Sequence, residues 1–342
     1  MADFSRLLSL ASTYAARVDW FVYSKFENGA PEELYRAAFH LYRAGGKRFR
    51  PFVVMATARM LGGPQSESDA LPFAAAVELF HTYTLIHDDI MDDDDYRRGV
   101  PTTHRIWGVP YAILAGDLDY ALSFKSIISA GSGSEAFDRT CILDAVETMV
   151  EASIRVAEGQ GYDMLFERRI DVDYHDYLSM IYRKTGALIE ASAKLGAIAA
   201  CQTNLKETMG EYGRLVGIAF QIRDDILGVF GDPSKTGKPI YNDLRRGKKT
   251  LLVLYAYKHA AGEDKKIIES VLRGEARDEE TLRRAAEIIR ETGALEYAEN
   301  LARRMADTAI KILDDIGEDV IEDEDAKEAL VELARFTVER EK

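Results

Sequence analysis

The sequence is poor in cysteine and in long apolar runs, and each shortage argues against a class of protein. It has two cysteines, Cys141 and Cys201, both in apolar, helix-like segments. We expect two buried free thiols in a reducing compartment, with a single disulfide as the alternative. No apolar stretch has the length of a membrane span, and residues 1–6 lack the basic and apolar regions of a signal peptide. These absences favour a cytoplasmic protein with no stable membrane insertion.

Positive charge and flexible linkers are also scarce. Lys and Arg number 44 against 58 Asp and Glu, and the net charge of −14 argues against nucleic acid as a partner. No long segment rich in Pro, Gly or Ser divides the chain, and Ala130–Ser134 is interpreted as a loop between helices. Although a length of 342 residues suggests roughly two domains, we predict a single domain over residues 1–342.

Few segments have the alternating pattern of a strand. Hydrophobic residues make up 47% of the chain, enough for a large core, and they recur at helical spacing. Two examples are the stripes Leu178-Ile181-Tyr182-Thr185-Leu188-Ile189-Ser192 and Leu282-Ala285-Ala286-Ile289. The pattern predicts an all-α protein.

A cluster of aspartates follows the apolar run Leu79–Ile86. Its members are Asp88, Asp89, Asp92, Asp93, Asp94 and Asp95. Negative charge at the end of a helix repels itself and opposes the helix dipole, so a cation is expected there. Asp88 and Asp92 share one helix face, and Mg²⁺ is usually held by one or two carboxylates plus substrate phosphates. For an acidic run alone, a solvated loop is the alternative.

The same pattern occurs again in the second half of the chain. Phe220–Leu227 aligns with Thr84–Met91, so Asp-Asp-Ile recurs at Asp224, 136 positions after Asp88 (224 − 88). Two acidic helix ends facing one cavity would form a metal cage for a polyphosphate. One acidic helix end alone is weak evidence for a metal site, and the two together are good evidence.

Basic residues beside glycine accompany both acidic clusters. They lie in Gly45–Pro51, Arg97–Gly99, Lys184–Gly186 and Lys235–Pro239. Lys and Arg bind phosphate oxygens through charge-assisted hydrogen bonds. Lys47 and Arg50 are three apart and would share a face if a helix has begun by then. Ordinary surface cations are the alternative, but they do not explain why these pairs recur beside both acidic ends.

Together these motifs resemble the trans-isoprenyl diphosphate synthases. The resemblance rests on Gly45–Pro51, His87–Asp92 with Arg97–Gly99, Gly159–Asp163, Lys184-Thr185, and Phe220–Asp225 with Lys235–Lys238. It implies the isoprenoid synthase fold, a bundle of antiparallel helices around a central cavity. It also implies a Mg²⁺-dependent prenyltransferase that joins isopentenyl diphosphate head-to-tail to dimethylallyl, geranyl or farnesyl diphosphate. A homodimer is expected from the family and from helices that are apolar on more than one face, such as Ala187–Ala200.

The resemblance also implies roles at the matching positions. Asp88, Asp92 and Asp224 would hold a set of three Mg²⁺ ions on the allylic diphosphate, supported by Asp89, Asp225 and Gln160. Arg97, Lys184 and Lys238 would bind that diphosphate. Lys47, Arg50, His81 and Arg98 would bind isopentenyl diphosphate, and Phe220 would line the substrate site. Thr185 and Gln221 would stabilise the allylic carbocation, and the leaving diphosphate would take the proton. The loop Asp232–Asp243 is a candidate lid that excludes water.

His81 needs a separate argument. A lone His in an apolar helix is usually a hydrogen-bonded core residue. His81 lies seven positions, about two turns, before Asp88 and so points to the same face. With the resemblance, contact with substrate is the better interpretation.

Product length should depend on the helix before the first Asp motif. Tyr83 lies five positions before Asp88, about 7.5 Å along a helix. In similar archaeal enzymes a bulky aromatic residue there forms the floor of the tunnel. Tyr83 with the small Thr84 therefore predicts geranylgeranyl diphosphate, and Phe80, one turn deeper, is another candidate floor. A farnesyl or a longer product (C25 or more) is the alternative.

Two details depart from other members of the family. The second motif often ends in a third Asp, and here that position is Gly228. Two residues separate Asp89 from Asp92, where bacterial and plant enzymes often have four.

A class I terpene cyclase would share the Asp motifs but would not need Lys47, Arg50 and Arg98. A regulatory subunit would have lost one Asp pair, and a plain helical scaffold would explain none of the motifs.

Overall fold

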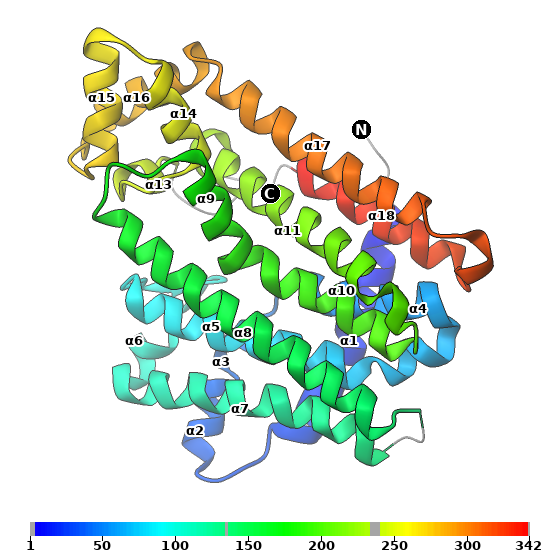
Figure 1. The fold of residues 1–342 in the computed structure, drawn as a ribbon. Coiled ribbons are helices and arrows are strands. Elements are labelled where there is room, and N and C mark those ends of the chain that lie inside the picture. Colours follow the sequence, from blue (N-terminus) through cyan, green and yellow to red (C-terminus); the bar gives the residue numbers. More distant parts are fainter. Residues whose placement is uncertain (1–3, 134–135, 233–239, 341–342) are drawn as a thin grey trace. The chain divides into compact units, whose positions relative to one another are not determined.

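The computed structural model describes residues 4–133, 136–232 and 240–340, and most of them are helical (Figure 1). The first elements are α1 (Ser5–Phe26), α2 (Glu32–Ala38), α3 (His40–Arg43), α4 (Phe49–Asp69), α5 (Leu71–Met91), the hairpin β1 (Tyr96–Arg97) and β2 (Val100–Pro101), α6 (Thr103–Trp107), α7 (Val109–Gly133) and α8 (Arg139–Glu167). Then follow α9 (Tyr174–Ile181), the π-helix η1 (Tyr182–Gly186), α10 (Ala187–Ala199), the 3₁₀ helix η2 (Thr203–Leu205), α11 (Lys206–Phe230), α13 (Asn242–Arg245), α14 (Leu251–His259), α15 (Gly262–Leu272), α16 (Glu279–Glu291), α17 (Ala294–Asp314), the 3₁₀ helix η3 (Glu318–Val320) and α18 (Glu324–Glu339). The all-α prediction is confirmed.

One predicted loop is wrong. We expected Ala130–Ser134 to connect two helices, but α7 continues to Gly133, and Ser134 lies outside the described residues. A glycine near a helix end costs only about 1 kcal/mol relative to alanine, so the chain tolerates it there. Within the described residues, no helix is long and apolar enough to cross a bilayer.

The chain divides into two compact units. The first contains residues 1–150, 191–210 and 316–330, and the second contains 151–190, 211–315 and 331–342. Four of the five boundaries fall inside α8, α10, α11 and α18, and the fifth, at residues 315/316, falls in the short segment between α17 and η3. The division therefore does not follow a linker, and the single domain over residues 1–342 stays a prediction.

The first unit is built around α5. This helix packs most extensively against α7 and also against α4 and α1, as the cyan and blue ribbons of Figure 1 show. Almost every residue from Phe73 to Phe80 is fully buried, because the helix is covered on several sides. The end of α5 that carries the first Asp motif is thereby held on a rigid support.

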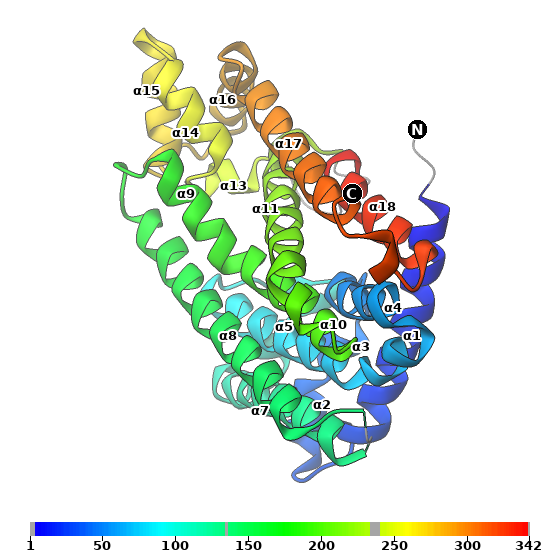
Figure 2. The same cartoon turned by 45° about the vertical axis from the view of Figure 1, so that its right-hand side comes forward.

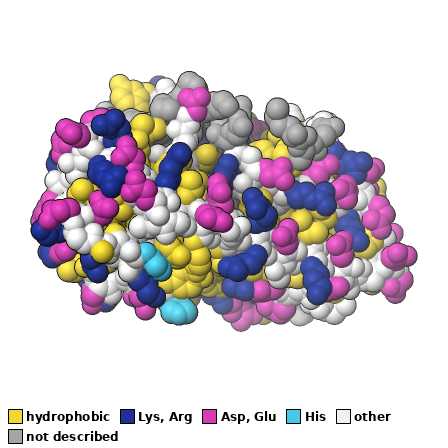
Figure 3. Space-filling view, turned by 90° about the horizontal axis from the view of Figure 1, so that it is seen from above, with side chains coloured by type: hydrophobic (Ala, Val, Ile, Leu, Met, Phe, Trp, Pro, Cys, Tyr) yellow, Lys and Arg dark blue, Asp and Glu magenta, His cyan; other side chains and the backbone are white. Residues whose placement is uncertain are grey.

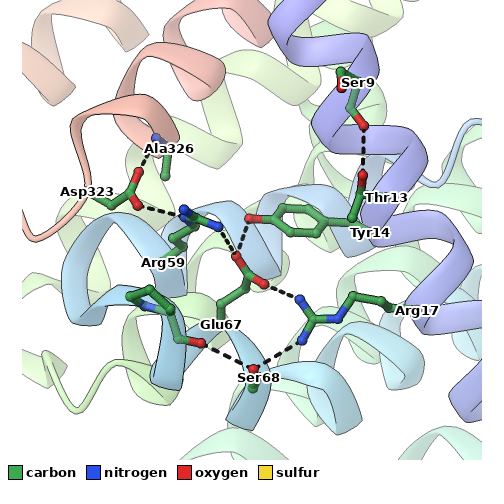
Figure 4. A network of polar contacts seen from close by, with 10 residues as sticks. Ser9, Thr13, Tyr14, Arg17, Arg59, Glu67, Ser68, Asp323 and Ala326 are labelled. Carbon is green, nitrogen blue, oxygen red and sulfur yellow. Dashed lines mark hydrogen bonds and ion pairs between the residues drawn. The ribbon is translucent and has the colours of Figure 1, made fainter.

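A buried carboxylate joins three helices of the first unit (Figure 4). Glu67, on α4, accepts hydrogen bonds from the Tyr14 hydroxyl (2.8 Å) and from Arg59 Nη1 (2.9 Å), and it pairs with Arg17. Arg59 Nε also donates to Asp323 Oδ2 (2.7 Å), whose other oxygen caps the start of α18 at Ala326 N. Because all the groups are paired, this buried network stabilises the contact of α1, α4 and α18.

The basic turn before α4 is fixed by Arg48, a residue that we did not single out. Its guanidinium is buried, pairs with Glu78 (2.8 Å) and Asp19 (3.0 Å), and donates to the Tyr42 carbonyl (2.9 Å). Gly45 has φ = 88° and Gly46 has φ = 154°, so the turn needs glycine at both positions. Arg48 therefore has a structural role beside the predicted ligands Lys47 and Arg50.

The second unit has its own core. Figure 2 shows α14, α15, α16 and α17 packed together, and buried side chains from these helices join others from α9 and α11. Leu282, Ala285, Ala286 and Ile289 are all buried, which confirms the predicted stripe. Lys249 Nζ donates to the carbonyls of Glu167, Gly247 and Leu272 at 2.8–2.9 Å. The Lys249 ammonium thus donates to three backbone carbonyls that would otherwise lack a hydrogen-bond partner.

The surface mixes charges of both signs (Figure 3). Ion pairs such as Lys266–Glu263 (2.6 Å) and Arg273–Glu269 (2.6 Å) lie on exposed helix faces, where such pairs contribute little to stability. Cys141 and Cys201 are both free, as predicted. The prediction that both are buried is wrong, because Cys201 is exposed in the turn after α10 and Cys141 is half-buried.

Candidate active site

The first Asp motif lies at the end of α5. The backbone N–H of Asp92 donates to the Asp88 carbonyl (2.8 Å), so the helix continues through the motif and both side chains start from one face. The Asp89 side chain is fully buried, and burial raises its pKa to about 6. Its Oδ1 accepts a hydrogen bond from Arg97, and its Oδ2 is buried without a partner among the described residues. The motif thus contains one buried carboxylate oxygen that no described residue satisfies.

The hairpin after α5 separates the two arginines that follow the motif. Arg98 and Gly99 have φ values of 54° and 79°, which turn the chain back on itself. Arg97 returns to the aspartates, within 3.7 Å of Asp88 and 3.4 Å of Asp94. Arg98 instead donates to the Leu41 carbonyl (3.0 Å). Arg97 thus neutralises part of the acidic cluster, and its contact with substrate stays a prediction.

A second group of side chains in the same unit combines two arginines with a histidine. Arg50, His81 and Arg98 gather near Glu78, the one carboxylate that raises the pKa of both arginines. Burial lowers the pKa of Arg50 to about 10, and the neighbouring Arg98 adds to this. Burial and the charge of Arg50 hold the pKa of His81 well below its usual value. Arg50 Nε is buried and has no hydrogen-bond partner in the described part of the chain. Such a site would be stabilised by an anion.

Lys47 does not share a helix face with Arg50. Arg48 has a φ of 50°, which is not helical, so α4 begins only at Phe49. Lys47 lies before the helix, is exposed, and places its ammonium 5.8 Å from the centre of the Phe49 ring. The condition for a shared helix face is therefore not met, although both residues belong to the same turn region.

In the second unit, α11 carries the second Asp motif and a chain of hydrogen bonds. Thr185 Oγ1 donates to Gln221 Oε1 (2.8 Å), and Gln221 Nε2 donates to Asp225 Oδ1 (2.9 Å). The Tyr177 hydroxyl donates to Asp225 Oδ2 (2.7 Å). Burial, together with the charge of Asp243, raises the pKa of Asp225 to about 7. The structure thus joins three predicted residues, Thr185, Gln221 and Asp225, in one network.

Asp224 has a different environment. Its side chain is 44% exposed, and its Oδ1 accepts a hydrogen bond from Arg340 Nη2 (3.2 Å). The Arg340 guanidinium also lies over the ring of Phe220, 4.0 Å from its centre. Of the adjacent pair, Asp224 is therefore the more accessible carboxylate for a ligand.

Lys184 and Thr185 lie in the π-helix η1, where one extra residue enters the helical turn. Lys184 Nζ pairs with Asp163 Oδ2 at 2.5 Å, and Asp163 closes the motif Gly159–Asp163 on α8. Although burial would raise the pKa of Asp163, Lys184 and Lys248 hold it below its usual value. A Cβ on Gly159 would lie 2.2 Å from the Lys184 backbone nitrogen, so only glycine fits there. Such π-bulges often occur at functional sites, because they redirect side chains.

The predicted chain-length residues belong to an aromatic cluster in the first unit. The Tyr83 ring lies 5.2 Å from Phe80, 5.2 Å from Tyr120 of α7 and 4.8 Å from His87. Phe80 is almost fully buried and is also 5.9 Å from Tyr120. Thr84 Oγ1 donates back to the His81 carbonyl (2.7 Å). The cluster makes one continuous aromatic wall on α5 and α7.

Several of the predicted features stay predictions. Lys235 and Lys238, with most of the candidate lid Asp232–Asp243, lie outside the described residues. Gln160 is half-buried on α8. The two Asp motifs lie in different units, so their convergence on one cavity stays a prediction.

The donor set fits a hard cation that also has phosphate ligands. No group of three or more His, Cys, Asp or Glu side chains in the described residues could hold a metal alone. Mg²⁺ is usually bound through one or two carboxylates plus substrate phosphates and waters, which requires no such cage. The orphaned Oδ2 of Asp89 and the accessible carboxylate of Asp224 agree with this mode.

Several residues at these sites were missed from the sequence, among them Tyr177, Tyr120, Asp243 and Arg340. Asp243 was named only as the end of the candidate lid, and the others lie far in sequence from the motifs that they contact. Asp163, by contrast, was marked as the last residue of the motif Gly159–Asp163. Contacts over such separations follow from tertiary folding, and local pattern does not reveal them.

Comparisons with known proteins agree on one family. The family model for polyprenyl synthetase matches residues 31–289. A geranylfarnesyl diphosphate synthase from Aeropyrum pernix is 50% identical over 93% of this chain and 97% of its own. The structure of geranylgeranyl pyrophosphate synthetase from Pyrococcus horikoshii Ot3 superposes with a TM-score of 0.88 at 38% identity and covers 98% of each chain. A polyprenyl synthase from Caulobacter crescentus CB15, complexed with calcium and isoprenyl diphosphate, gives a TM-score of 0.86 at 32% identity, over 99% of this chain and 98% of its own.

Proposed function

Because the chain belongs to the polyprenyl synthetase family and is a trans-prenyltransferase, we propose that its main product is geranylgeranyl diphosphate. It would be made by successive addition of isopentenyl diphosphate to dimethylallyl, geranyl and farnesyl diphosphates. The observation that carries the proposed product length is the aromatic cluster of Phe80, Tyr83 and Tyr120. These rings would end the path of a prenyl chain whose diphosphate is held at Asp88.

A C25 product is the second candidate. The relative from Aeropyrum pernix with 50% identity is a geranylfarnesyl diphosphate synthase, so the same scaffold supports one further isoprene unit. The small Thr84 beside Tyr83 argues against a farnesyl stop, because farnesyl synthases tend to be bulkier at both positions. A difference of one aromatic side chain would decide between the C20 and the C25 product.

Metal binding is proposed at Asp88, Asp92 and Asp224, with Asp89, Asp225 and Gln160 in support. The relative from Caulobacter crescentus CB15 was solved with calcium and isoprenyl diphosphate, which supports a divalent cation beside a diphosphate. We assign Mg²⁺, in a set of three ions. When bound, the metal would neutralise the diphosphate as it leaves. Arg97, Lys184 and Lys238 would supply further positive charge to the same group.

The group of Arg50, His81 and Arg98, together with Lys47, is proposed to bind isopentenyl diphosphate. A bound anion would offset the cost of burying positive charge there, and it would accept a hydrogen bond from Arg50 Nε. A terpene cyclase has no use for this second diphosphate site. Its presence favours the synthase over the cyclase alternative.

The proposed reaction needs no protein base. The C1–O bond of the allylic diphosphate breaks, and the double bond of isopentenyl diphosphate attacks C1. The departing diphosphate takes the proton lost from C2. Thr185 donates its hydroxyl proton to Gln221, so the lone pairs of its oxygen stay available to the allylic cation. Gln221 is held in turn by Asp225, which fixes the amide orientation.

A homodimer is proposed, but not through Ala187–Ala200. Those residues are almost all buried within the single chain, so their apolar character has another explanation. In the first unit, α7 and α8 instead expose large apolar side chains: Ile113, Leu114, Ile128, Leu143 and Val150. An apolar surface of this kind is typical of a protein interface. The cytoplasm stays the predicted location.

A chain-length assay tests the proposal. Purified protein is incubated with Mg²⁺, isopentenyl diphosphate and, in parallel, dimethylallyl, geranyl or farnesyl diphosphate, and the dephosphorylated products are separated by size. A dominant C20 alcohol supports geranylgeranyl diphosphate, and a C25 alcohol supports the second candidate. Cyclised products from an allylic substrate alone would overturn the synthase assignment. Light scattering of Ile128→Asp beside the native protein tests the dimer.

A further inference from the structure

Arg340, the residue after α18, is held by one turn of α11. Its Nη2 donates to Asp224 Oδ1 (3.2 Å) and to the Phe220 carbonyl (3.3 Å). Its guanidinium lies over the Phe220 ring at 4.0 Å. Arg223 donates through Nε (3.0 Å) and Nη2 (2.9 Å) to the Arg340 carbonyl. Side chain and backbone of Arg340 are therefore both fixed on the segment that carries the second Asp motif.

These contacts differ from an ordinary surface ion pair. The Arg340 side chain is 5% exposed, and its stacking on Phe220 leaves little freedom to the guanidinium. Holding the arginine by several groups reduces the entropy that an exposed pair would lose. The partner Asp224 is 44% exposed, so only one side of the pair faces solvent. The buried Arg340 can therefore hold the Asp224 carboxylate rigidly, while part of that carboxylate stays accessible from solvent.

We propose that Arg340 is a positioning residue for Asp224. By holding Oδ1, it orients the carboxylate and leaves Oδ2, which has no hydrogen bond within the described residues, for a metal–diphosphate complex. Carboxylates that bind metals are themselves usually hydrogen-bonded, and loss of such a partner typically lowers metal affinity by about 10–100-fold. The inference rests on the proposed role of Asp224 as a metal ligand.

Metal binding in the absence of turnover tests the inference. Titration calorimetry with Mn²⁺ in the presence of inorganic pyrophosphate compares the native protein with Arg340→Gln, which removes the charge and the fork. Arg335→Gln is the matched control, because Arg335 lies on α18, just before Arg340, is exposed, and its replacement changes the net charge equally. We expect Arg340→Gln to weaken binding by about 10–100-fold, Arg340→Lys to weaken it less, and the control to bind normally. Unchanged or tighter binding by a folded Arg340→Gln protein would overturn the inference.

Two further variants separate this inference from the proposed function. Asp224→Asn should weaken metal binding, and adding Arg340→Gln to it should then have little further effect. If Asp224→Asn binds normally, the assignment of Asp224 as a metal ligand fails. If Asp224→Asn weakens binding and Arg340→Gln alone does not, only the inference about Arg340 fails. Circular dichroism checks that each variant is folded, and Arg340→Lys keeps the test open if Arg340→Gln is not.

Discussion

The carboxylate of Asp243 lies beside the Cα of Gly228. A Cβ built on Gly228 would be 2.5 Å from Asp243 Oδ2, closer than real Cβ contacts. Gly228 stands where the second motif often has its third Asp, and Asp243 brings a carboxylate to that place from α13. The Tyr241 backbone N–H donates to the Gly228 carbonyl (3.1 Å) and holds the two segments together. The glycine thus makes room for an acidic group supplied from elsewhere in the chain.

We therefore predict that Gly228→Ala destabilises the protein. Alanine normally stabilises a helix interior by about 1 kcal/mol relative to glycine, but here its Cβ would displace Asp243. Because the crowded atom is the end of the Asp243 side chain, we expect a small net loss, up to about 1 kcal/mol, in the free energy of unfolding, measured by urea denaturation. Gly161→Ala is the control, because a Cβ on Gly161 of α8 would meet nothing within 4 Å. Equal stabilisation by both substitutions would contradict the close approach of Asp243.

The aromatic cluster predicts how product length changes. Tyr83→Ala should give products longer than those of the native enzyme, because it removes the ring between Phe80 and His87. Tyr120→Ala should act in the same direction, since its ring contacts both Phe80 and Tyr83. The double variant should give the longest products, measured by separation of the dephosphorylated alcohols. Tyr96→Ala, at a position 71% exposed, is the control. Unchanged product length in both single variants would refute the proposed floor.

Replacing Arg50 should affect one substrate more than the other. Loss of a hydrogen bond between charged groups costs about 1.5–3 kcal/mol, so Arg50→Met should raise KM for isopentenyl diphosphate about 10–100-fold. The KM for farnesyl diphosphate should change little. Arg36→Gln, at an exposed position on α2, controls for net charge. Equal effects on both KM values would contradict a dedicated isopentenyl site.

Asp119 predicts an unusual dependence of stability on pH. Its side chain on α7 is buried, both carboxylate oxygens lack hydrogen-bond partners among the described residues, and burial raises its pKa well above the usual value. The folded state therefore keeps a proton that the unfolded chain releases near pH 4. This contribution to stability is complete below that pH and is lost as pH rises towards the folded pKa.

Replacement of Asp119 tests that sign. Asp119→Leu removes a buried polar group without partners and should stabilise the protein at pH 8 by about 1–3 kcal/mol. The gain in the free energy of unfolding should be smaller at pH 5. At that pH, protonating the Asp119 carboxyl on folding costs the native protein less free energy, because pH 5 is closer to the pKa of the unfolded chain. Denaturant unfolding at the two pH values measures the difference, with Asp117→Leu as the control on the exposed side of α7. A stabilisation independent of pH would show that Asp119 is ionised in the folded state.

The fold and the family were predicted correctly from helical spacing and motifs, whereas the burial of single residues was predicted less well. Helical spacing identified the all-α fold, and the stripe on α16 is buried as expected. The burial of Cys201 and the end of α7 were predicted wrongly, because burial and helix ends depend on neighbours that a local pattern does not contain. The family emerged from short motifs since the chemistry of diphosphates needs acidic and basic groups at defined spacing.

The sequence by itself determined the helices, the two Asp motifs and the basic residues beside them, because these depend on spacing along the chain. Only the tertiary structure brought Asp243 beside Gly228, Arg340 onto Asp224 and Tyr120 against Tyr83. Arg340 and Asp224 are 116 positions apart, and no local pattern links them. Such pairs are decided by the packing of helices, in which the burial of apolar faces fixes which distant side chains meet.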